Sequence, residues 1–490
     1  MIAQPFIYEI NTWPWLAELG TDLAGVPDDV WDSIADLGFD AVWLMGVWRR
    51  SPAGIARALD EPAVAQSFQD VLPDFTVDDV AGSAYCIRDY QVDERLGGTV
   101  GLVAARKSLA ERGLSLILDF VPNHVAPDHP WIRSNPEYFI TGSVDDLRDD
   151  PESFVEIGGT VFANGRDPYF PAWRDVVQLN TFSPALRNQV AQTLLSIAEQ
   201  CDGVRCDMAM LPLDDVVTRT WGERAGNPPA DGYWPTAIAA VRRVHPDFVF
   251  IAEAYWDLES RLQEQGFDYC YDKRLYDSYA GHEGADAVRA RLSADTDHQR
   301  GLIRFLENHD EPRAASTFGA DEHKAVAVAT LTGLGAKLIY DGQLSGAVRR
   351  VPVHLGRGPV EEVDKDLAEF YLSVLGSLRD PVWRTGDWAP CDITGWEGNT
   401  TSGSLLAWTR RGESRWLVVV NLSDSTASGT VATHWDDLRG SRFRLVDTTR
   451  DLDFLRSGDD VCDGMFIELD PWLWHLFRID ETETTTEERV

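Results

Sequence analysis

Residues 114–124 read LSLILDFVPNH, a short apolar run that ends in a cluster of polar residues. Near-continuous apolar character is typical of a strand that is buried on both faces of a parallel sheet. Seven more segments have this form, and stretches with helical periodicity separate them. They are PFIYEIN (5–11), DAVWLMGV (40–47), GVRCDMA (203–209), DFVFIAEAY (247–255), FDYCYD (267–272), LIRFLEN (302–308) and AKLIYDG (336–342).

The alternation of strands and helices up to about residue 380 predicts βα units around a parallel sheet. Eight strands at this spacing favour closure into a barrel, so we expect an α/β fold with a TIM (β/α)8 barrel over residues 1–380. An open, doubly wound sheet is the alternative.

Three further regions interrupt or follow the predicted barrel. Residues 125–180 are rich in Pro, Gly, Asp and aromatic residues, and we expect a short inserted loop domain there, after the third strand. Alternating apolar residues and turn signals predict a C-terminal antiparallel β-sandwich over residues 381–480. The polar segment 481–490 is predicted to be a disordered tail.

The composition argues against several kinds of partner. With 80 acidic and 44 basic residues the net charge is −36, which repels polyanions, so we expect neither nucleic acid nor a membrane as partner. Only five of the basic residues are lysines. Such a surface stays soluble in concentrated salt and indicates a salt-adapted, halophilic protein. An acidic protein from a GC-rich genome is the alternative.

Targeting signals are not expected either. No Lys or Arg precedes Arg49, so the N-terminus lacks the basic region of a secretory signal. The longest apolar runs, such as AVWLMGVW at 41–48, are shorter than the ~18 residues of a membrane span. The six cysteines have neither disulfide-framework nor metal-site spacing. We therefore predict a cytoplasmic protein, whose oligomeric state the sequence does not indicate.

Polar residues stand repeatedly at the carboxyl ends of the predicted strands, where a TIM barrel carries its site. They are Asp119, Asn123 and His124 at the third strand, Arg205 and Asp207 at the fourth, Glu253 at the fifth, and His309 and Asp310 at the seventh. Taken singly, each has a structural explanation, such as a helix cap, an ion pair or a buried histidine. Together they favour glycoside hydrolysis, which needs a pair of carboxyl groups at the scissile bond.

These four segments resemble the signature regions of the α-amylase superfamily, also called glycoside hydrolase family thirteen. DFVPNH, GVRCDMA, IAEAYW and FLENHD occur in the family's order of strand-three, nucleophile, acid/base and stabiliser regions. GSAYCIRDYQVDERLGG (82–98) and VVQLN (176–180) are further matches, and the resemblance covers the whole chain.

The resemblance implies a role for each matching residue. The implied catalytic residues are Asp207 as nucleophile, Glu253 as general acid/base and Asp310 as transition-state stabiliser. The implied substrate-binding residues are Tyr85, which stacks on the sugar in subsite −1, His124 and His309, which hydrogen-bond it, and Arg205, which keeps the nucleophile ionised. We expect Asp119 to pair with Arg205.

The chain departs from the family pattern on the acceptor side. Many members have a Lys-His pair shortly after the nucleophile, whereas Met208 to Leu211 follow Asp207 here, so subsites +1 and +2 must differ. In exo-acting α-glucosidases of the family, an Asp stands three residues before the stacking tyrosine. This chain has Gly82 there, which argues against simple exo-glucosidase action.

A second departure concerns metal. The family's structural calcium is held by the Asn of the third-strand motif, here Asn123, and by an Asp where this chain has Gln178. Neutral amide oxygens bind Ca²⁺ weakly, so we predict no cofactor and no obligatory metal. Asp341 stands where members often have an aromatic residue or histidine, and the sequence does not explain it.

Three functions are considered. The first is a retaining α-glycosidase that acts on α-1,4-linked gluco-oligosaccharides through a covalent glycosyl-enzyme, with an α-glucan or maltooligosaccharide as substrate. The second is a transglycosylase, sugar-phosphate-dependent transferase or disaccharide isomerase that shares this intermediate. The third, a catalytically silent carbohydrate-binding protein, should lack a carboxylate, and all three are present.

Overall fold

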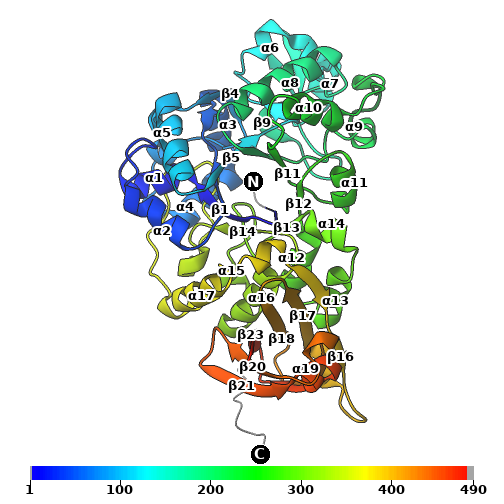
Figure 1. Ribbon diagram of the computed structural model, residues 1–490. Coiled ribbons are helices and arrows are strands. Elements are labelled where there is room, and N and C mark those ends of the chain that lie inside the picture. The colour runs from blue at the N-terminus through cyan, green and yellow to red at the C-terminus, as the bar shows by residue number, and fades with distance from the viewer. Residues whose placement is uncertain (1–2, 483–490) are drawn as a thin grey trace, which may run out of the picture.

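The computed structural model describes residues 3–482, and its centre is a closed barrel of eight parallel strands (Figure 1). The barrel confirms the predicted fold class, and the open sheet is wrong. Around the barrel the strands follow the order β1-β14-β13-β12-β11-β10-β5-β2. Their bounds are β1 Phe6–Asn11, β2 Ala41–Met45, β5 Ser115–Phe120, β10 Gly203–Cys206, β11 Val249–Ala252, β12 Tyr269–Tyr271, β13 Leu302–Arg304 and β14 Ala336–Tyr340.

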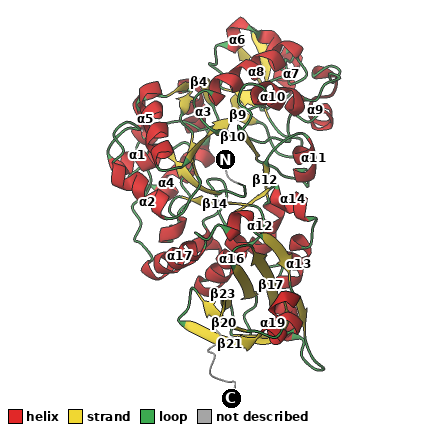
Figure 2. Ribbon diagram, viewed as in Figure 1, coloured by secondary structure: helices red, strands yellow, loops and turns green. Residues whose placement is uncertain are grey.

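One or more helices lie between successive barrel strands (Figure 2). The helix α8 begins as its sequence predicts, with Pro184 in the first turn and the Ser183 side chain accepting from the Leu186 N–H. The helices of the barrel region are α1 Thr12–Leu19, α2 Asp28–Asp36, α3 Pro52–Asp60, α4 Pro62–Val71, α5 Gly98–Glu111, α8 Pro184–Ala198, α9 Asp214–Trp221, α10 Tyr233–Arg242, α11 Glu259–Glu264, α12 Lys273–Ala280, α13 Ala285–Leu292, α14 Thr296–Arg300, α15 Ala314–Thr317, α16 Ala320–Thr332 and α17 Lys365–Ser377.

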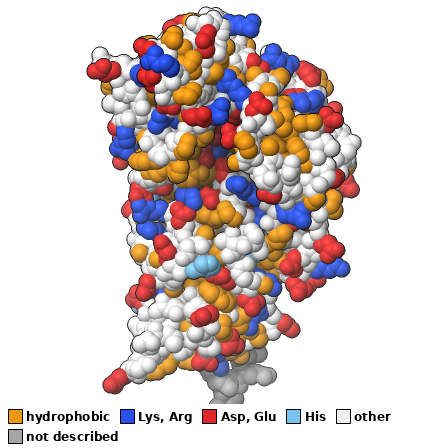
Figure 3. Space-filling view, turned by 180° about the vertical axis from the view of Figure 1, so that it is seen from behind, with side chains coloured by type: hydrophobic (Ala, Val, Ile, Leu, Met, Phe, Trp, Pro, Cys, Tyr) orange, Lys and Arg blue, Asp and Glu red, His pale blue; other side chains and the backbone are white. Residues whose placement is uncertain are grey.

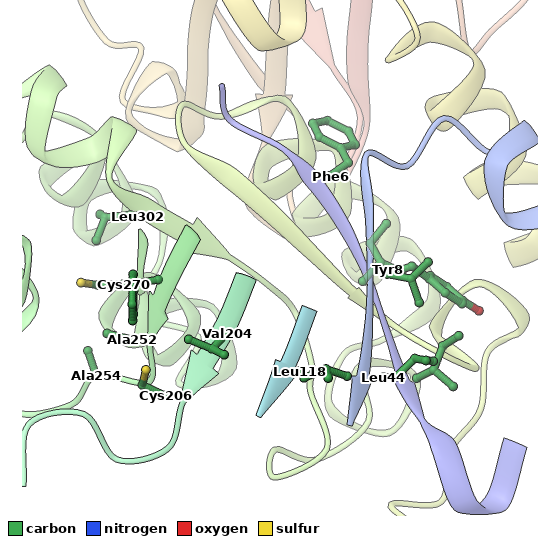
Figure 4. Close-up of a cluster of buried hydrophobic side chains, with 14 of the residues drawn as sticks. Phe6, Tyr8, Leu44, Leu118, Val204, Cys206, Ala252, Ala254, Cys270 and Leu302 are labelled. Carbon is green, nitrogen blue, oxygen red and sulfur yellow. The ribbon is translucent and has the colours of Figure 1, made fainter. Parts of the chain in front are cut away.

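All barrel strands except β10 contribute apolar side chains to two separate cores. Leu118, Val204 and Ala252 belong to the core that the barrel shares with its helices (Figure 4). Ile117 and Ile251 belong to a second core inside the barrel. Because side chains alternate between the two faces of a strand, this division explains why the strands are apolar almost without interruption.

The same alternation places polar side chains inside the barrel. Asp119 and Glu253 stand two residues after Ile117 and Ile251, and Arg205 stands between two outward-facing neighbours. All three side chains are buried. The polar residues at the strand ends therefore converge on the carboxyl end of the barrel, where a TIM barrel carries its site.

The region after β5 contains the predicted insertion, a four-stranded antiparallel sheet in the order β6-β9-β8-β7. Its strands are β6 His124–Val125, β7 Phe154–Ile157, β8 Thr160–Gly165 and β9 Trp173–Gln178. Two short helices, α6 Trp131–Ser134 and α7 Val144–Asp149, lie between β6 and β7. A further two-stranded sheet pairs β3 Trp48–Arg50 with β4 Ile87–Val92 in the preceding region.

The C-terminal region contains two antiparallel sheets, as predicted for a sandwich. The larger has the order β15-β17-β18-β23-β20-β21 and the smaller the order β16-β19-β22. Their strands are β15 Asp387–Pro390, β16 Asp392–Thr394, β17 Leu405–Arg411, β18 Arg415–Asn421, β19 Ala427–Ala432, β20 Arg442–Asp447, β21 Leu452–Ser457, β22 Met465–Leu469 and β23 Trp474–Glu481, with the short helices α18 Val382–Thr385 and α19 Gly458–Asp463.

The strands β17 and β18 pack on both faces. Leu405 and Leu417 face the smaller sheet, whereas Leu406 and Val418 belong to the core of the barrel. The sandwich is therefore built directly onto the barrel. The predicted domain boundaries at residues 380 and 480 stay predictions. Of the predicted tail, Glu481 lies in β23, and residues 483–490 lie outside the described part of the chain.

Acidic and basic side chains are interspersed on the face shown in Figure 3. Many of the exposed arginines lie within ion-pair distance of aspartates, such as Arg439 with Asp463 and Arg224 with Asp146. Within residues 3–482, no helix is both long and apolar enough to cross a membrane.

Candidate active site

Arg205 lies at the centre of the carboxyl groups inside the barrel. Its Nη1 is 2.7 Å from Asp207 Oδ1 and its Nη2 is 2.8 Å from Glu253 Oε2. The guanidinium has no exposed surface. A buried arginine is stable only when its charge is paired, so Arg205 holds these two carboxyl groups side by side.

Glu253 is the proton-holding member of this pair. Burial raises its pKa to about 7, with Arg205 opposing the rise and the nearby Asp207 and Asp310 adding to it. Burial also raises the pKa of Asp207, whereas the ion pair with Arg205 opposes that rise. Each of the two carboxyl groups disfavours the ionised form of the other, and this adds to the rise in the pKa of Glu253.

His309 connects the third carboxylate to the first barrel strand. Its Nδ1 is 2.5 Å from Glu9 Oε1, and its Nε2 is 3.0 Å from Asp310 Oδ2 and 2.6 Å from the Tyr85 hydroxyl. Burial favours the neutral ring, but the two carboxylates outweigh burial and raise the pKa of His309 to about 10. His309 is therefore a cation at neutral pH.

Asp310 differs from the other carboxyl groups of the site in its exposure. Burial works against its charge, but the cation of His309 holds the pKa of Asp310 at about 2. Its side chain is 45% exposed, whereas those of Asp207 and Glu253 are 8% and 3% exposed. The cluster thus opens to solvent at Asp310, the direction from which a substrate can enter.

The structure brings together most of the predicted site residues. Arg205 forms ion pairs with Asp207 and Glu253. A second group consists of Asp310, His309 and Tyr85, whose hydroxyl bonds His309. The Arg205 guanidinium lies 5.0 Å from the centre of the Tyr85 ring. This cation–π contact connects the two groups of residues.

His124 and Asp119 differ from the other predicted site residues in their contacts. His124 is buried beside Asn123 and Trp173, and among residues 3–482 no hydrogen bond or ion pair joins it to the three carboxylates. The predicted ion pair of Asp119 with Arg205 is wrong. Although the two residues are neighbours on adjacent strands, Asp119 Oδ2 accepts from the Gly46 N–H at 2.7 Å, and the ion pairs of Arg205 are with Asp207 and Glu253.

The residues at the family's calcium position do not fit a cation. The side-chain amide of Gln178 is 2% exposed, and its Nε2 donates toward Asn123 Oδ1, the Asn123 carbonyl and the Leu179 carbonyl at 2.9–3.0 Å. Its Oε1 accepts from Asn123 Nδ2 at 3.2 Å. A calcium ion needs converging oxygens, and here they converge on an amide NH₂ group instead.

Within residues 3–482, no group of three or more His, Cys, Asp or Glu side chains has an arrangement suited to a metal ion. Asp341, which the sequence left unexplained, has a structural partner. The Tyr8 hydroxyl donates to Asp341 Oδ1 at 2.5 Å, and this contact joins the first and last barrel strands.

The segment after Asp207 is apolar, and an aromatic pair lies beyond Glu253. Ala209, Met210 and Leu211, which follow Asp207, are buried and present no polar group to a sugar. Instead, Trp256 from the loop after β11 packs edge-on against Tyr169 from the inserted sheet, with ring centres 4.8 Å apart.

Sequence reasoning missed two residues that contact the site. Glu9 lies within the first strand, FIYEIN, and is buried. A carboxylate in such an apolar segment was a signal that the sequence already contained. Tyr255, whose hydroxyl donates to Glu253 Oε1 at 2.9 Å, gave no signal beyond its position two residues after Glu253.

Fold and site together define an α/β-barrel protein with a carboxylate cluster at the carboxyl end of its strands. A family model described as the alpha amylase catalytic domain matches residues 16–403. The chain therefore belongs to the alpha-amylase family.

Curated relatives are distant. The chain is 22% identical over 356 residues to the alpha-amylase MalA of Haloarcula japonica, which is 69% of this chain and 44% of the relative. It is 22% identical over 269 residues to alpha-amylase 3 of Dictyoglomus thermophilum, which is 52% of each. The chain thus spans about half the length of these relatives.

Solved structures support the fold along the whole chain. The maltogenic alpha-amylase AmyB of Thermotoga neapolitana superposes with a TM-score of 0.68 at 18% identity, over 98% of this chain and 99% of that one. The alpha-amylase of Geobacillus thermoleovorans, crystallised with acarbose, gives a TM-score of 0.69 at 18% identity, over 98% and 99% of the two chains.

Proposed function

We propose that the protein is a retaining enzyme that acts on α-1,4-linked gluco-oligosaccharides through a covalent glycosyl-enzyme. The observation that carries this proposal is the single guanidinium of Arg205 between Asp207 and Glu253. Retaining glycosidases keep their two carboxyl groups about 5–5.5 Å apart, whereas inverting enzymes leave room for a water between them. A bridging arginine favours the close arrangement.

Each carboxyl group has a distinct task in this mechanism. Protonated Glu253 gives its proton to the leaving glycosidic oxygen while an ionised Asp207 oxygen attacks the anomeric carbon. The bond between that carbon and the leaving oxygen breaks, and a glycosyl ester with Asp207 forms. Glu253 then takes a proton from water or a sugar hydroxyl, whose oxygen attacks the same carbon. The ester bond breaks, Asp207 leaves as a carboxylate, and the α configuration is restored.

The remaining residues support the transition state. Asp310, held ionised by the His309 cation, lies at the open side of the cluster and stabilises the positive charge that develops on the sugar ring. Arg205 favours the ionised form of Asp207. Tyr85 and His309 complete the wall of the sugar site, with His124 behind them as an expected further donor.

Transfer to a sugar acceptor is the second candidate function. It is favoured by the aromatic pair of Trp256 and Tyr169, which offers an acceptor sugar a stacking surface on the loop that follows Glu253. Hydrolysis and transfer share the intermediate, so they differ only in whether water or a sugar reaches it first.

Product analysis tests both proposals. Maltooligosaccharides are incubated with the enzyme, with and without added glucose or phosphate, and products are identified by mass spectrometry. Proton NMR during the first turnovers gives the anomer released. We expect the α-anomer first, and longer or phosphorylated products only if transfer occurs. Initial release of the β-anomer would overturn the retaining mechanism.

A further inference from the structure

The two oxygens of the Glu253 carboxyl group have different surroundings. Oε2 accepts from the Met208 N–H at 2.5 Å and lies 2.8 Å from Arg205 Nη2. Both of these partners are donors only. A proton on Oε2 would therefore point at groups that cannot accept it.

Oε1 has one hydrogen-bond partner among the described residues, the Tyr255 hydroxyl at 2.9 Å. Unlike the donors at Oε2, a hydroxyl both donates and accepts. It is therefore compatible with either state of the carboxyl group, donating to an ionised Oε1 and accepting from a protonated one.

We propose that Tyr255 is a positioning residue that keeps the proton of Glu253 on Oε1 and stabilises the carboxylate left when that proton is transferred. The inference rests on the proposed function. During the first step the proton moves from Oε1 to the leaving oxygen, which also receives the electron pair of the broken bond. The Tyr255 O–H then donates to the charged Oε1, so its contribution grows in the transition state and appears in kcat.

The backbone just after Tyr255 is held in an unusual conformation. Trp256 and Asp257 both have φ of 62°, in the left-handed region that residues other than glycine rarely adopt. Asp257 forms an ion pair with Arg274, and Trp256 packs on Tyr169. Strained residues persist where their surroundings fix them, so these contacts hold the backbone of the loop that carries Tyr255.

The test is the pH profile of Tyr255→Phe, which keeps the ring and removes only the hydroxyl. Loss of a donor to the ionised carboxylate raises the pKa of Glu253, so the alkaline limb of kcat/KM should move up by about 0.5–1 pH unit. We expect kcat to fall about 3- to 10-fold on maltooligosaccharides, with little change in KM. The charged and titratable groups that face Glu253 are Arg205, Asp207, Asp310, Tyr255 and Tyr271, and the other four are unchanged in this variant.

A substrate with a good leaving group adds a second readout. An aryl α-maltoside whose phenol leaves without a proton should show a smaller loss of kcat in Tyr255→Phe than a maltooligosaccharide does. Tyr371→Phe is the matched control, because it removes a buried hydroxyl whose hydrogen-bond partners among residues 3–482 are His323 and Gln343. Its alkaline limb should coincide with that of the wild type.

Two results would overturn the inference: an unmoved alkaline limb in Tyr255→Phe, or an equal loss of kcat on both substrates. Neither result touches the proposed function, which is tested separately by Glu253→Gln. If Glu253→Gln keeps its activity on maltooligosaccharides, the proposed function fails first, and the role of Tyr255 fails with it.

Discussion

Gln178 offers the sharpest test of how this chain replaces a metal site. Replacing it by leucine keeps the volume close but removes the amide that bonds Asn123 and Leu179. At least two buried acceptors, Asn123 Oδ1 and the Leu179 carbonyl, then lose this donor, and each unsatisfied group costs about 1–3 kcal/mol. We therefore expect Gln178→Leu to lower the free energy of unfolding by about 2–5 kcal/mol, a large part of a typical total.

The assay is urea unfolding followed by tryptophan fluorescence, with and without EDTA. Gln66→Leu is the control, because Gln66 is exposed and bonds only Asp70, so its change should stay within about 0.5 kcal/mol. The wild type should unfold at the same urea concentration, and keep the same activity, in EDTA and in calcium.

A second variant reverses the chemistry of the site. Gln178→Asp places an unpaired carboxylate among the oxygens of Asn123 and Leu179, which is the ligand set that calcium prefers. This variant should be destabilised in EDTA and partly restored by millimolar calcium, because a ligand that binds only the folded state stabilises it. The reasoning is refuted if EDTA weakens the wild type and calcium restores it, or if Gln178→Leu matches Gln66→Leu.

Three further predictions concern catalysis and charge. Asp207→Asn and Glu253→Gln should each lower turnover by several orders of magnitude with unchanged circular dichroism, and activity above a few per cent in either would reject its role. The pKa of His309 is raised from 6.5 to about 10, so its contribution to the stability of the folded state is complete below pH 6.5 and is lost as the pH rises through 10. The free energy of unfolding of His309→Gln, measured in urea, should accordingly depend less on pH over that range than that of the wild type. If the acidic surface is a salt adaptation, the melting temperature should rise with KCl into the molar range, and a flat or falling midpoint would favour the compositional alternative.

The barrel could be predicted from sequence because its strands are buried on both faces. Segments such as LSLILDFV keep their apolar character whichever residue faces inward, so all eight strands were recognisable. The strand β17 illustrates the limit of this signal. LLAW is apolar because Leu405 faces the smaller sheet and Leu406 faces the barrel. The sequence predicted the sandwich, but it did not indicate that the other face of this sheet packs on the barrel.

The contacts within the site were less predictable than its members. Asp119 and Arg205 are adjacent in register, yet their ion pair does not form, and Arg205 pairs instead with Asp207 and with Glu253 from the next strand. Glu9 lies 300 residues from His309 in sequence and meets it only after the barrel closes. Such contacts form only when distant strands meet in the closed barrel, and the pattern within one segment does not predict them.

The charges of the site explain why Glu253 holds a proton. Two cations, Arg205 and His309, face five carboxyl groups, and burial penalises every charge left unpaired. The five are those of Asp207, Glu253, Glu9, Asp310 and Asp119. Burial raises the pKa of Asp119 to about 6 and that of Glu253 to about 7, so these two groups take up protons first as the pH falls. Asp119 is fully buried, whereas Oε1 of Glu253 lies beside the Tyr255 hydroxyl, which can either donate or accept a hydrogen bond. The proton on Glu253 therefore reduces the excess negative charge of the cluster, and it is also the proton that the proposed reaction uses.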